Sequence, residues 1–325
     1  MIKLSRHAYP LEPAGQQELI GLWRSEWTRT DYDWLEALNG DYADTLRTVS
    51  VVARIDGRAV ASATVNFAAH APETCLIGNV VTLAAFRGQG LAKLVTDAAV
   101  AIGFEAGCTL AFLGSSRMEG NVYERCGFIR VAGSIMCRAA PGFEADMTFA
   151  PGHAVALRDA QWGDMTGFVR LLTQPLADAV IDMPRGLMSI AAADPKRCVS
   201  AFPLVHESVH QRGGVVLMLA AIDSSRIFGM GTLTPGPAPS VSHRGIVDVA
   251  AHASYATHRD EMLARLLAAA GSRRIETLEA VVVTSDTAKL EALGRAGFRP
   301  VATLPGHLRL RSGPADAVRL ELKLT

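Results

Sequence analysis

Hydrophobic and polar positions along the first half of the chain predict an ordered series of helices and strands. Residues 13–28 have apolar positions at helical spacing, and the apolar face of this helix carries Leu19, Leu22, Trp23 and Trp27. Residues 47–55 and 59–68 predict a hairpin, because Asp56-Gly57 between them is a strong turn signal. The later predicted elements are a strand at 76–84, a helix at 91–104, a strand at 108–114, a helix at 119–126 and two strands near 128–139. This order is typical of an α/β (α+β) fold with a mixed sheet between helices.

The second half of the chain repeats this order after a linker. Residues 141–153 contain two Pro-Gly turns and no clear periodicity, so they are the predicted linker. The elements predicted after it are a strand and helix in 154–173, a hairpin at 215–221 and 226–233, a strand at 246–253, a helix at 258–270, a strand at 276–283, a helix at 286–295 and closing strands. Gly127-Phe128 and Gly297-Phe298 follow matching helices. We therefore expect an internal duplication, with domains at 1–140 and 154–325.

The composition is that of a globular protein with no excess of either charge. Of 325 residues 49% are hydrophobic, and 32 Lys and Arg balance 32 Asp and Glu. Since no basic run occurs, we expect no nucleic acid partner. No apolar stretch is long enough to span a membrane and no signal-peptide pattern begins the chain, so we expect a cytoplasmic protein without a membrane partner. The scattered cysteines predict reduced, mostly buried thiols: Cys75, Cys108, Cys126, Cys137 and Cys198.

Residues 79–94 carry the clearest chemical pattern in the chain. A hydrophobic strand runs into a glycine-rich turn, and a helix begins at about Leu91. Gly88 and Gly90 lack side chains, so the first amides of that helix are open to a ligand. Arg87 adds a positive charge at the same place. Together these features predict a site for a phosphate-bearing ligand and suit a pyrophosphate.

Two common nucleotide-binding motifs do not fit this turn. The dinucleotide fingerprint needs a third Gly or Ala three residues beyond Gly90, where Lys93 stands instead. A P-loop needs Gly-Lys followed by Ser or Thr, which this turn lacks. The pattern Arg-x-x-Gly-x-Ala does fit, with Arg87, Gly90 and Ala92.

About thirty residues after the turn comes a second motif, Tyr123-Glu-Arg-Cys-Gly-Phe128. In this order the two motifs resemble those of the GCN5-related N-acetyltransferase (GNAT) family. The resemblance covers residues 79–128 closely and 1–140 more weakly. It implies two tandem GNAT-like domains, each with a mixed, mostly antiparallel sheet flanked by helices on both faces. Residues 1–140 would be the catalytic domain that binds acyl-CoA, and 154–325 a degenerate copy.

The resemblance implies a direct transfer of an acyl group from acyl-CoA to a small amine in a ternary complex. Acetyl-CoA is the expected co-substrate. Backbone amides in the strand before the turn would hold the thioester oxygen, and the candidates are Val81, Thr82 and Leu83. The remaining residues implied to contact the cofactor are Arg87, Gly88, Gln89, Gly90, Leu91, Ala92 and, where the family often has Asn, Ser116.

Tyr123 matches the tyrosine that, in the family, donates a proton or hydrogen bond to the leaving sulfur. A thiol with a pKa near ~8.5 leaves readily, so this donor helps without being required. The alternative is a half-buried tyrosine that only packs under the Gly-Phe turn. For the general base we take Glu73, at the start of the strand, with His70, Asp31 and Asp33 as other candidates. Each of these four is also a typical surface residue.

The acceptor pocket is implied to lie at residues 29–45, a segment that is both acidic and aromatic. We take Asp31, Asp33 and Trp34 as substrate-binding residues, because carboxylates and aromatic faces both attract cations. This composition suits a small, cationic amine. A solvated amphipathic helix explains the same pattern equally well.

The second copy differs where the first would bind the cofactor. Ala256–Glu261 stands in place of the glycine turn, and Asp260 and Glu261 fall in the first turn of the following helix. Carboxylates there stabilise the helix and repel a pyrophosphate. Leu293 stands where the first copy has Tyr123. We therefore expect no CoA in the second copy.

Other functions stay open on the sequence alone. A GNAT fold could also decarboxylate an acyl-CoA or bind it without turnover, and a homodimer is compatible with the chain. His206-Glu-Ser-Val-His210 matches the zinc-protease motif. However, Val216 stands where a metzincin has its third ligand, and the predicted helix is short, ending at Gly213-Gly214. We therefore expect no metal.

Overall fold

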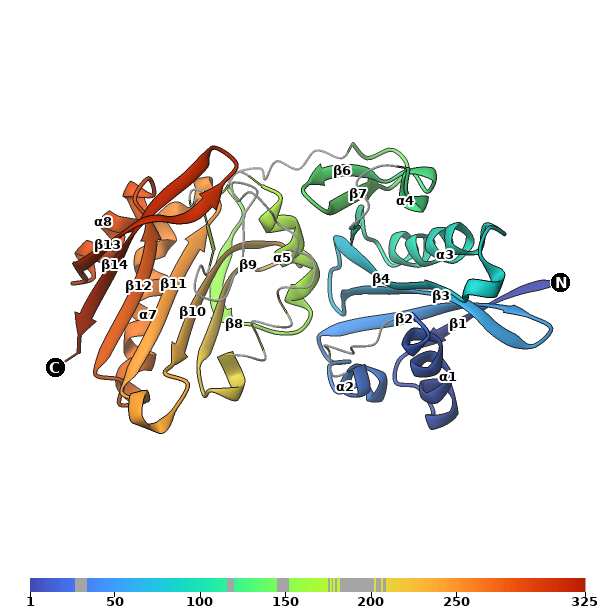
Figure 1. Cartoon of the computed structure of the whole chain (residues 1–325), viewed down its shortest axis with the longest axis horizontal. Coiled ribbons are helices and arrows are strands. Elements are labelled where there is room, and N and C mark those ends of the chain that lie inside the picture. Colours follow the sequence, from blue (N-terminus) through green and yellow to red (C-terminus); the bar gives the residue numbers. More distant parts are fainter. Residues whose placement is uncertain are drawn as a thin grey trace. The chain divides into compact units, whose positions relative to one another are not determined.

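The computed structural model forms two compact units (Figure 1). The first unit is Met1–Asp146 with Gln161–Gly167, and the second is Met147–Ala160 with Phe168–Thr325. The structure describes residues 1–26, 34–115, 120–144, 152–174, 176, 178, 180–181, 202, 206 and 209–324.

The first unit is built around a seven-stranded mixed sheet in the order β1-β2-β3-β4-β5-β7-β6. The parallel pair is β4 with β5, and the other pairs are antiparallel. Its elements are β1 (Ile2–Ala8), α1 (Pro13–Arg24), α2 (Trp34–Asn39), β2 (Leu46–Ile55), β3 (Arg58–Ala68), β4 (Thr74–Thr82), the 3₁₀ helix η1 (Ala84–Phe86), α3 (Leu91–Glu105), β5 (Leu110–Gly114), α4 (Val122–Arg125), β6 (Ile129–Ala132) and β7 (Ile135–Ala139).

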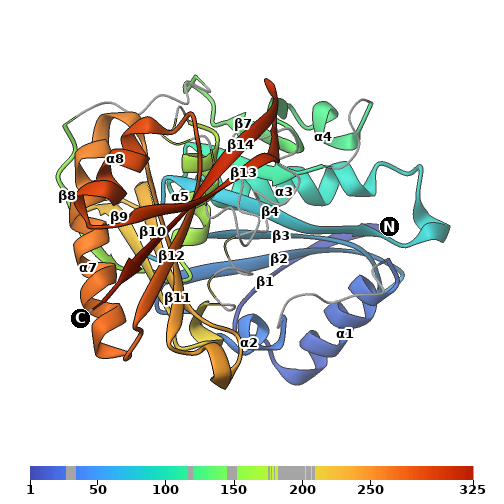
Figure 2. The same cartoon turned by 60° about the vertical axis from the view of Figure 1, so that its left-hand side comes forward.

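Helices cover both faces of this sheet, as Figures 1 and 2 show. On one face α3 packs through Val95 and Ala99 against buried residues of β2 to β5. On the other face α1 and α2 bury Trp23 and Leu38 against Val52. The expected fold with helices on both faces of a mixed sheet is therefore confirmed.

Local sequence signals placed most elements of this unit correctly. The Asp56-Gly57 turn joins β2 to β3, with φ angles of 50° and 82° that a tight hairpin turn requires. Helix α1 ends at Arg24 rather than at residue 28, and Trp27 lies outside the described residues. Strand β1 was not among the predicted elements. It lies at the edge of the sheet, where most of its side chains are exposed and no strong apolar alternation is required.

The second unit repeats the topology of the first. Counted from β8, its sheet has the order β8-β9-β10-β11-β12-β14-β13, which matches the first sheet strand for strand. The predicted duplication is thus present at the level of the fold. Its elements are β8 (Val155–Asp159), α5 (Asp164–Leu172), β9 (Val215–Ala221), β10 (Ile227–Pro235), η3 (Pro239–Val241), β11 (Arg244–Ala251), η4 (Ala253–His258), α7 (Arg259–Ser272), β12 (Thr277–Val283), α8 (Thr287–Arg295), β13 (Arg299–Leu310) and β14 (Gly313–Lys323).

The parallel strands at the centre of each sheet pair only at their beginnings. In the first unit β4 and β5 are joined over Thr74–Leu76 and Leu110–Phe112, although β4 continues to Thr82. In the second unit β11 and β12 are joined over three positions, beginning at the pair Arg244 and Thr277. Beyond these positions the two strands are no longer paired with each other. In each sheet the carboxyl end of β4 or β11 therefore has one unpaired side, which we call the opening.

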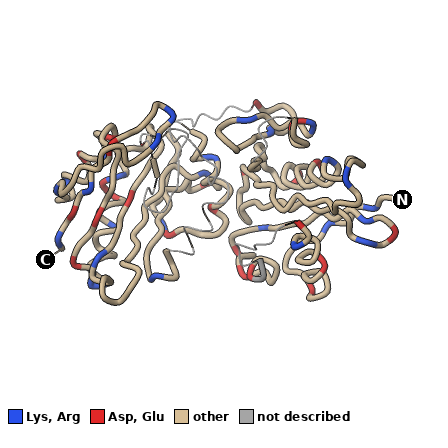
Figure 3. The backbone as a smooth tube through the Cα atoms, in the orientation of Figure 1, with Lys and Arg blue, Asp and Glu red and all other residues tan. Residues whose placement is uncertain are grey.

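The surface and thiols agree with the composition. Lys and Arg are interspersed with Asp and Glu along both units (Figure 3). The cysteines in the described part of the chain are buried and free: Cys75, Cys108, Cys126 and Cys137. Among the described residues, no helix is both long and apolar enough to cross a membrane.

The close packing of α3 on β4 gives a stability prediction. A Cβ atom at Gly103 would lie 2.4 Å from the Cys75 Sγ and 3.0 Å from its Cβ. We expect Gly103→Ala to lower the free energy of unfolding by about 1–3 kcal/mol, the usual cost of overpacking. Gly21→Ala in α1 is the matched control, because its Cβ meets nothing within 4 Å. It should raise stability by about 0.5–1 kcal/mol through helix propensity. Urea unfolding measures both, and an equal change in the two variants would contradict the packing.

Candidate functional site

The glycine turn lies between η1 and α3 and is exposed from Arg87 to Gly90. Gly88 and Gly90 have φ angles of 79° and 77°, a backbone conformation that disfavours other residues. No atom lies within 4 Å of an added Cβ at either position, so the backbone angle, and not crowding, requires glycine. The turn therefore presents bare backbone to solvent.

The first amides of helix α3 make no hydrogen bond within the helix. The Leu94 N–H donates to the Gly90 carbonyl at 3.0 Å, which is the first bond of the helix. The amides of residues 91–93 precede that bond. The N-cap residue is Gly90, which has no side chain to accept from them, and the first turn has no acidic residue. This end of α3 is thus suited to an anion.

Arg87 stands beside these amides and is held by two contacts. Its Nε donates to the Thr82 carbonyl at 3.2 Å, and its Nη2 contacts the Glu26 carboxylate at 2.5 Å. The side chain of Arg87 is 55% exposed, so the ion pair with Glu26 is in contact with water. Exposed pairs of this kind contribute at most about 1 kcal/mol. A phosphate could therefore compete with Glu26 for the guanidinium.

Strand β4, which precedes the glycine turn, is irregular near its carboxyl end. Ser62 faces Val81 while Thr64 faces Gly78, so Asn79 and its neighbour oppose a single residue of β3. This is a β-bulge, and Asn79 has a φ of 50°. Bulges twist a strand away from its neighbour. The bulge accompanies the divergence of β4 from β5.

Of the amides expected to hold a thioester oxygen, the one at Thr82 faces the opening. The Leu83 N–H already donates to the Val60 carbonyl of β3 at 2.9 Å. In an antiparallel ladder, alternate residues bond to the same neighbour, so Val81 also bonds toward β3. Thr82 then points its N–H the other way, toward the side from which β5 has diverged.

Tyr123 is the second residue of α4, and Asn121 fixes its backbone. The Asn121 Oδ1 accepts from the N–H groups of Tyr123 at 2.9 Å and Glu124 at 3.1 Å. The Tyr123 ring is half-buried, packs on the α3 core and meets the edge of Phe128 with centroids 6.4 Å apart. The Phe128 N–H closes the turn by donating to the Tyr123 carbonyl at 3.0 Å. Asn121 was missed in the sequence, although Asn three residues before Glu is a helix-start signal.

Comparison with known families agrees with this geometry. Residues 16–128 match the model of the Acetyltransferase (GNAT) family. The first unit contains a GNAT acetyltransferase domain. The match includes the glycine turn, the strand before it and the Tyr-Gly-Phe motif, so the resemblance proposed from the sequence is confirmed.

Solved structures with some similarity to the chain include three acetyltransferases. They include a ribosomal-protein-alanine N-acetyltransferase from Brucella melitensis (17% identity, 52% of this chain and 99% of that chain, TM-score 0.41). Another is an N-acetyltransferase from Staphylococcus aureus Mu50 (16% identity, 53% of this chain and 99% of that chain, TM-score 0.43). A third is a GNAT superfamily phosphinothricin acetyltransferase from Sinorhizobium meliloti in complex with acetyl-CoA (12% identity, 52% of this chain and 88% of that chain, TM-score 0.42). No curated protein matches the chain. The family assignment rests on the match at residues 16–128.

Two of the other predicted site residues, Glu73 and His70, lie at the opposite end of β4 from the turn. Glu73 precedes β4 at the end where β4 and β5 are still paired, and its carbonyl accepts from the amides of Thr109 and Leu110. His70 is exposed in the loop before it. Trp34 is the first residue of α2. The remaining predicted residues, Asp31, Asp33 and Ser116, lie outside the described part of the chain.

The second unit has the strand and the 3₁₀ helix that precede α3 in the first unit, but it lacks the glycine turn. The His252 N–H donates to the Phe228 carbonyl at 2.8 Å, as Leu83 does in the first unit, and both residues precede a 3₁₀ helix. There η4 runs directly into α7, whose first turn contains Asp260 and Glu261. The expected loss of the glycine turn is therefore confirmed.

The motif that resembles a zinc site also lies in the second unit. The rings of His206 and His210 have centroids 4.2 Å apart, while Glu207 is outside the described residues. In the part of the chain that the structure describes, no group of three or more His, Cys, Asp or Glu residues could hold a metal ion.

The cap of α4 gives a prediction about the position of Tyr123. Asn121→Ala removes the acceptor of two amides and should lower the free energy of unfolding by about 0.5–2 kcal/mol. Asn121→Ser keeps an oxygen at this position and should lose less. Urea unfolding compares the variants, and equal losses in Ala and Ser would show that the cap does not hold α4.

Proposed function

We propose that the first unit is an acyl-CoA-dependent N-acyltransferase that transfers an acetyl or related acyl group to a small amine. The observation that carries this proposal is the uncapped start of α3, with Arg87 beside it, next to the opening between β4 and β5. An anion site and an unpaired strand edge lie end to end. Acyl-CoA has the matching parts, a pyrophosphate followed by a polar, amide-containing arm.

The binding mode follows from these two features. The pyrophosphate would accept hydrogen bonds from the amides of residues 88–93 and from Arg87, which would leave Glu26. The arm would lie along β4 and take the place of a paired strand. The Thr82 amide would donate to an oxygen of that arm or of the thioester, so it is our choice among the three strand amides.

The reaction would be a direct attack within a ternary complex. The amine nitrogen forms a bond to the thioester carbon, and the carbonyl oxygen becomes an oxyanion that backbone amides of β4 can stabilise. Collapse of this intermediate breaks the carbon–sulfur bond. Tyr123 would donate its proton to the departing thiolate. Glu73, the base expected from the sequence, precedes β4 at the end opposite Thr82, beyond the reach of one bridging water, so in this proposal the amine gives up its proton to solvent water.

The acceptor is proposed to be a small, cationic amine. Acidic residues follow α2, and the Tyr42 hydroxyl donates to the Glu36 carboxylate. Asp41 and Asp44 lie close in sequence. Carboxylates attract an ammonium group before it loses its proton. In this proposal Asp31, Asp33 and Trp34 complete the pocket.

The cofactor site is tested by its cation. Arg87→Gln should weaken acetyl-CoA binding about tenfold or more, because a charged donor to the pyrophosphate is lost. Gly90→Val should weaken it further, since valine disfavours the positive φ that shapes the turn. Arg6→Gln is the matched control, with a similarly exposed ion pair to Glu105. Titration calorimetry measures the affinities, and unchanged binding in both turn variants would refute the proposal.

Tyr123 is tested separately as the proton donor. Tyr123→Phe keeps the ring packed against Phe128 and removes the hydroxyl. We expect kcat to fall about tenfold or more with little change in the KM for acetyl-CoA. If the tyrosine serves only packing, Tyr123→Phe will be fully active and Tyr123→Ala will lose stability instead.

A further inference from the structure

The second unit buries a cluster of charges that the proposed reaction does not use. Asp178, Asp248, Arg259 and Lys289 are 2%, 6%, 4% and 2% exposed. Charged side chains are rarely buried this deeply unless they are paired. The burial of these four side chains therefore depends on how they are paired.

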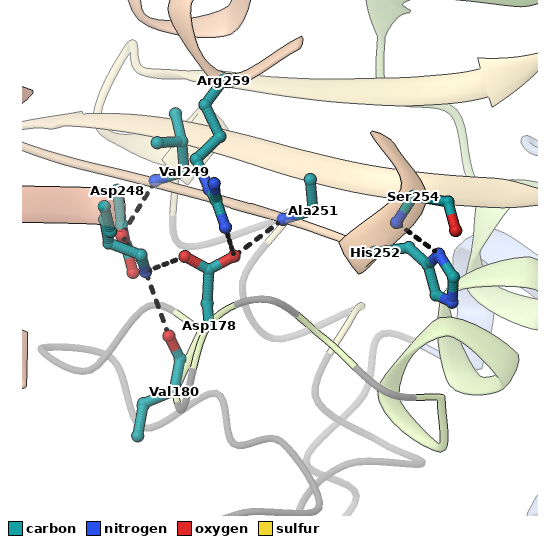
Figure 4. Close-up of polar contacts among 9 residues, drawn as sticks. Asp178, Val180, Asp248, Val249, Ala251, His252, Ser254 and Arg259 are labelled. Atoms are coloured by element: carbon teal, nitrogen blue, oxygen red, sulfur yellow. Dashed lines mark hydrogen bonds and ion pairs between the residues drawn. The ribbon is translucent and has the colours of Figure 1, made fainter. Parts of the chain in front are cut away.

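A single carboxylate lies at the centre of the cluster (Figure 4). The Asp178 Oδ2 accepts from the Ala251 N–H at 3.0 Å and from the Arg259 Nη2 at 3.2 Å. The Asp178 Oδ1 lies 3.6 Å from the Lys289 Nζ. One backbone amide and two cations thus face the carboxylate, although its Oδ1 accepts no hydrogen bond from the described residues.

Lys289 is held in place by further partners. Its Nζ donates to the Val180 carbonyl at 3.2 Å and to the Asp248 carboxylate at 3.0 Å. Burial by itself lowers the pKa of Lys289, but the carboxylates of Asp248, Asp178 and Asp286 outweigh burial and raise the pKa above its usual value. Lys289 is therefore a positive charge at any physiological pH.

The Ala251 amide has a counterpart in the first unit. His252 is the counterpart of Leu83, since each donates its N–H to the neighbouring antiparallel strand and precedes a 3₁₀ helix. Ala251 is therefore the counterpart of Thr82. Both amides face the opening between the diverging parallel strands. In the second unit that amide already has an oxygen bound to it.

Leu176 and Val180, which lie on either side of Asp178 in the sequence, contact the two parallel strands. Leu176 forms an antiparallel bridge with His252, at the end of β11. Val180 packs against Val283, the last residue of β12, and against Leu310. The same stretch thus contacts the ends of both strands that have diverged.

We propose that the Ala251 amide, Arg259 and Lys289 form a carboxylate-binding site in the second unit, and that Asp178 is its built-in ligand. The site occupies the place that corresponds to the proposed acyl-CoA arm in the first unit. The second unit is therefore closed to acyl-CoA by the chain's own carboxylate. Only the closure to acyl-CoA rests on the proposed function.

The proposal is tested by removing the carboxylate and supplying a free one. Asp178→Ala should lower the melting temperature in scanning calorimetry by about 10 °C, because two buried cations lose their partner. Excess sodium formate should recover several degrees of this loss by filling the vacated site. Sodium chloride at equal ionic strength should not recover it.

Two further variants keep the test decisive. Asp159→Ala is the control, since its carboxylate is 77% exposed in β8 of the same unit. It should melt like the wild type and show no specific response to formate. Asp178→Asn keeps the shape and the acceptor for Ala251, so it should fold, melt between the wild type and Asp178→Ala, and be insensitive to formate. An Asn variant as stable as the wild type, or an equal formate effect in all proteins, would overturn the proposal.

Stoichiometry separates this inference from the proposed function. Titration calorimetry of the wild type with acetyl-CoA should give one site per chain. Two sites would overturn the closure of the second unit. No binding would refute the function proposed for the first unit, while the formate experiment would still decide the role of Asp178.

Discussion

The short pairing of the central parallel strands is the constraint on which both units depend. β4 and β5, like β11 and β12, are joined over three positions and then separate. Beyond that point backbone amides at the carboxyl end of β4 and β11 face an opening instead of a strand. A backbone donor must find a partner wherever water is excluded. Each unit therefore needs something other than a strand beside Thr82 or Ala251, and the two units differ in what they supply.

The helix that follows the diverging strand decides which partner is suitable. In the first unit a glycine turn leaves the start of α3 bare, with Arg87 exposed beside it. This end is suited to binding an anion from solution. In the second unit Arg259 begins α7 and is already paired with Asp178 inside the protein. The exposed residue next to Arg259 in the first turn of α7 is Asp260. Its carboxylate is paired with Arg295 and would repel a phosphate. The same frame thus has opposite electrostatics at equivalent places.

The two copies differ at the proposed cofactor site. Residues 16–128 match a family of acetyltransferases and contain the open turn together with Tyr123. The second unit preserves the strand order and the Gly-Phe turn, but a buried Leu293 replaces the tyrosine. In both copies the phenylalanine amide donates to the residue at this position, at 3.0 Å. The two copies therefore share a scaffold and differ in the side chains at this position.

The sequence alone determined the features that depend on neighbours along the chain. The Asp56-Gly57 hairpin, the glycine turn and the Gly-Phe turns need particular backbone angles, so their residue types reveal them. The order of helices and strands followed from periodicity, and with it the duplication. Only the tertiary structure decided which distant groups meet. Glu26 reaches Arg87 across 61 residues, and Asp178 reaches the Ala251 amide across 73. Such contacts depend on how strands diverge and helices pack, and no local pattern encodes them.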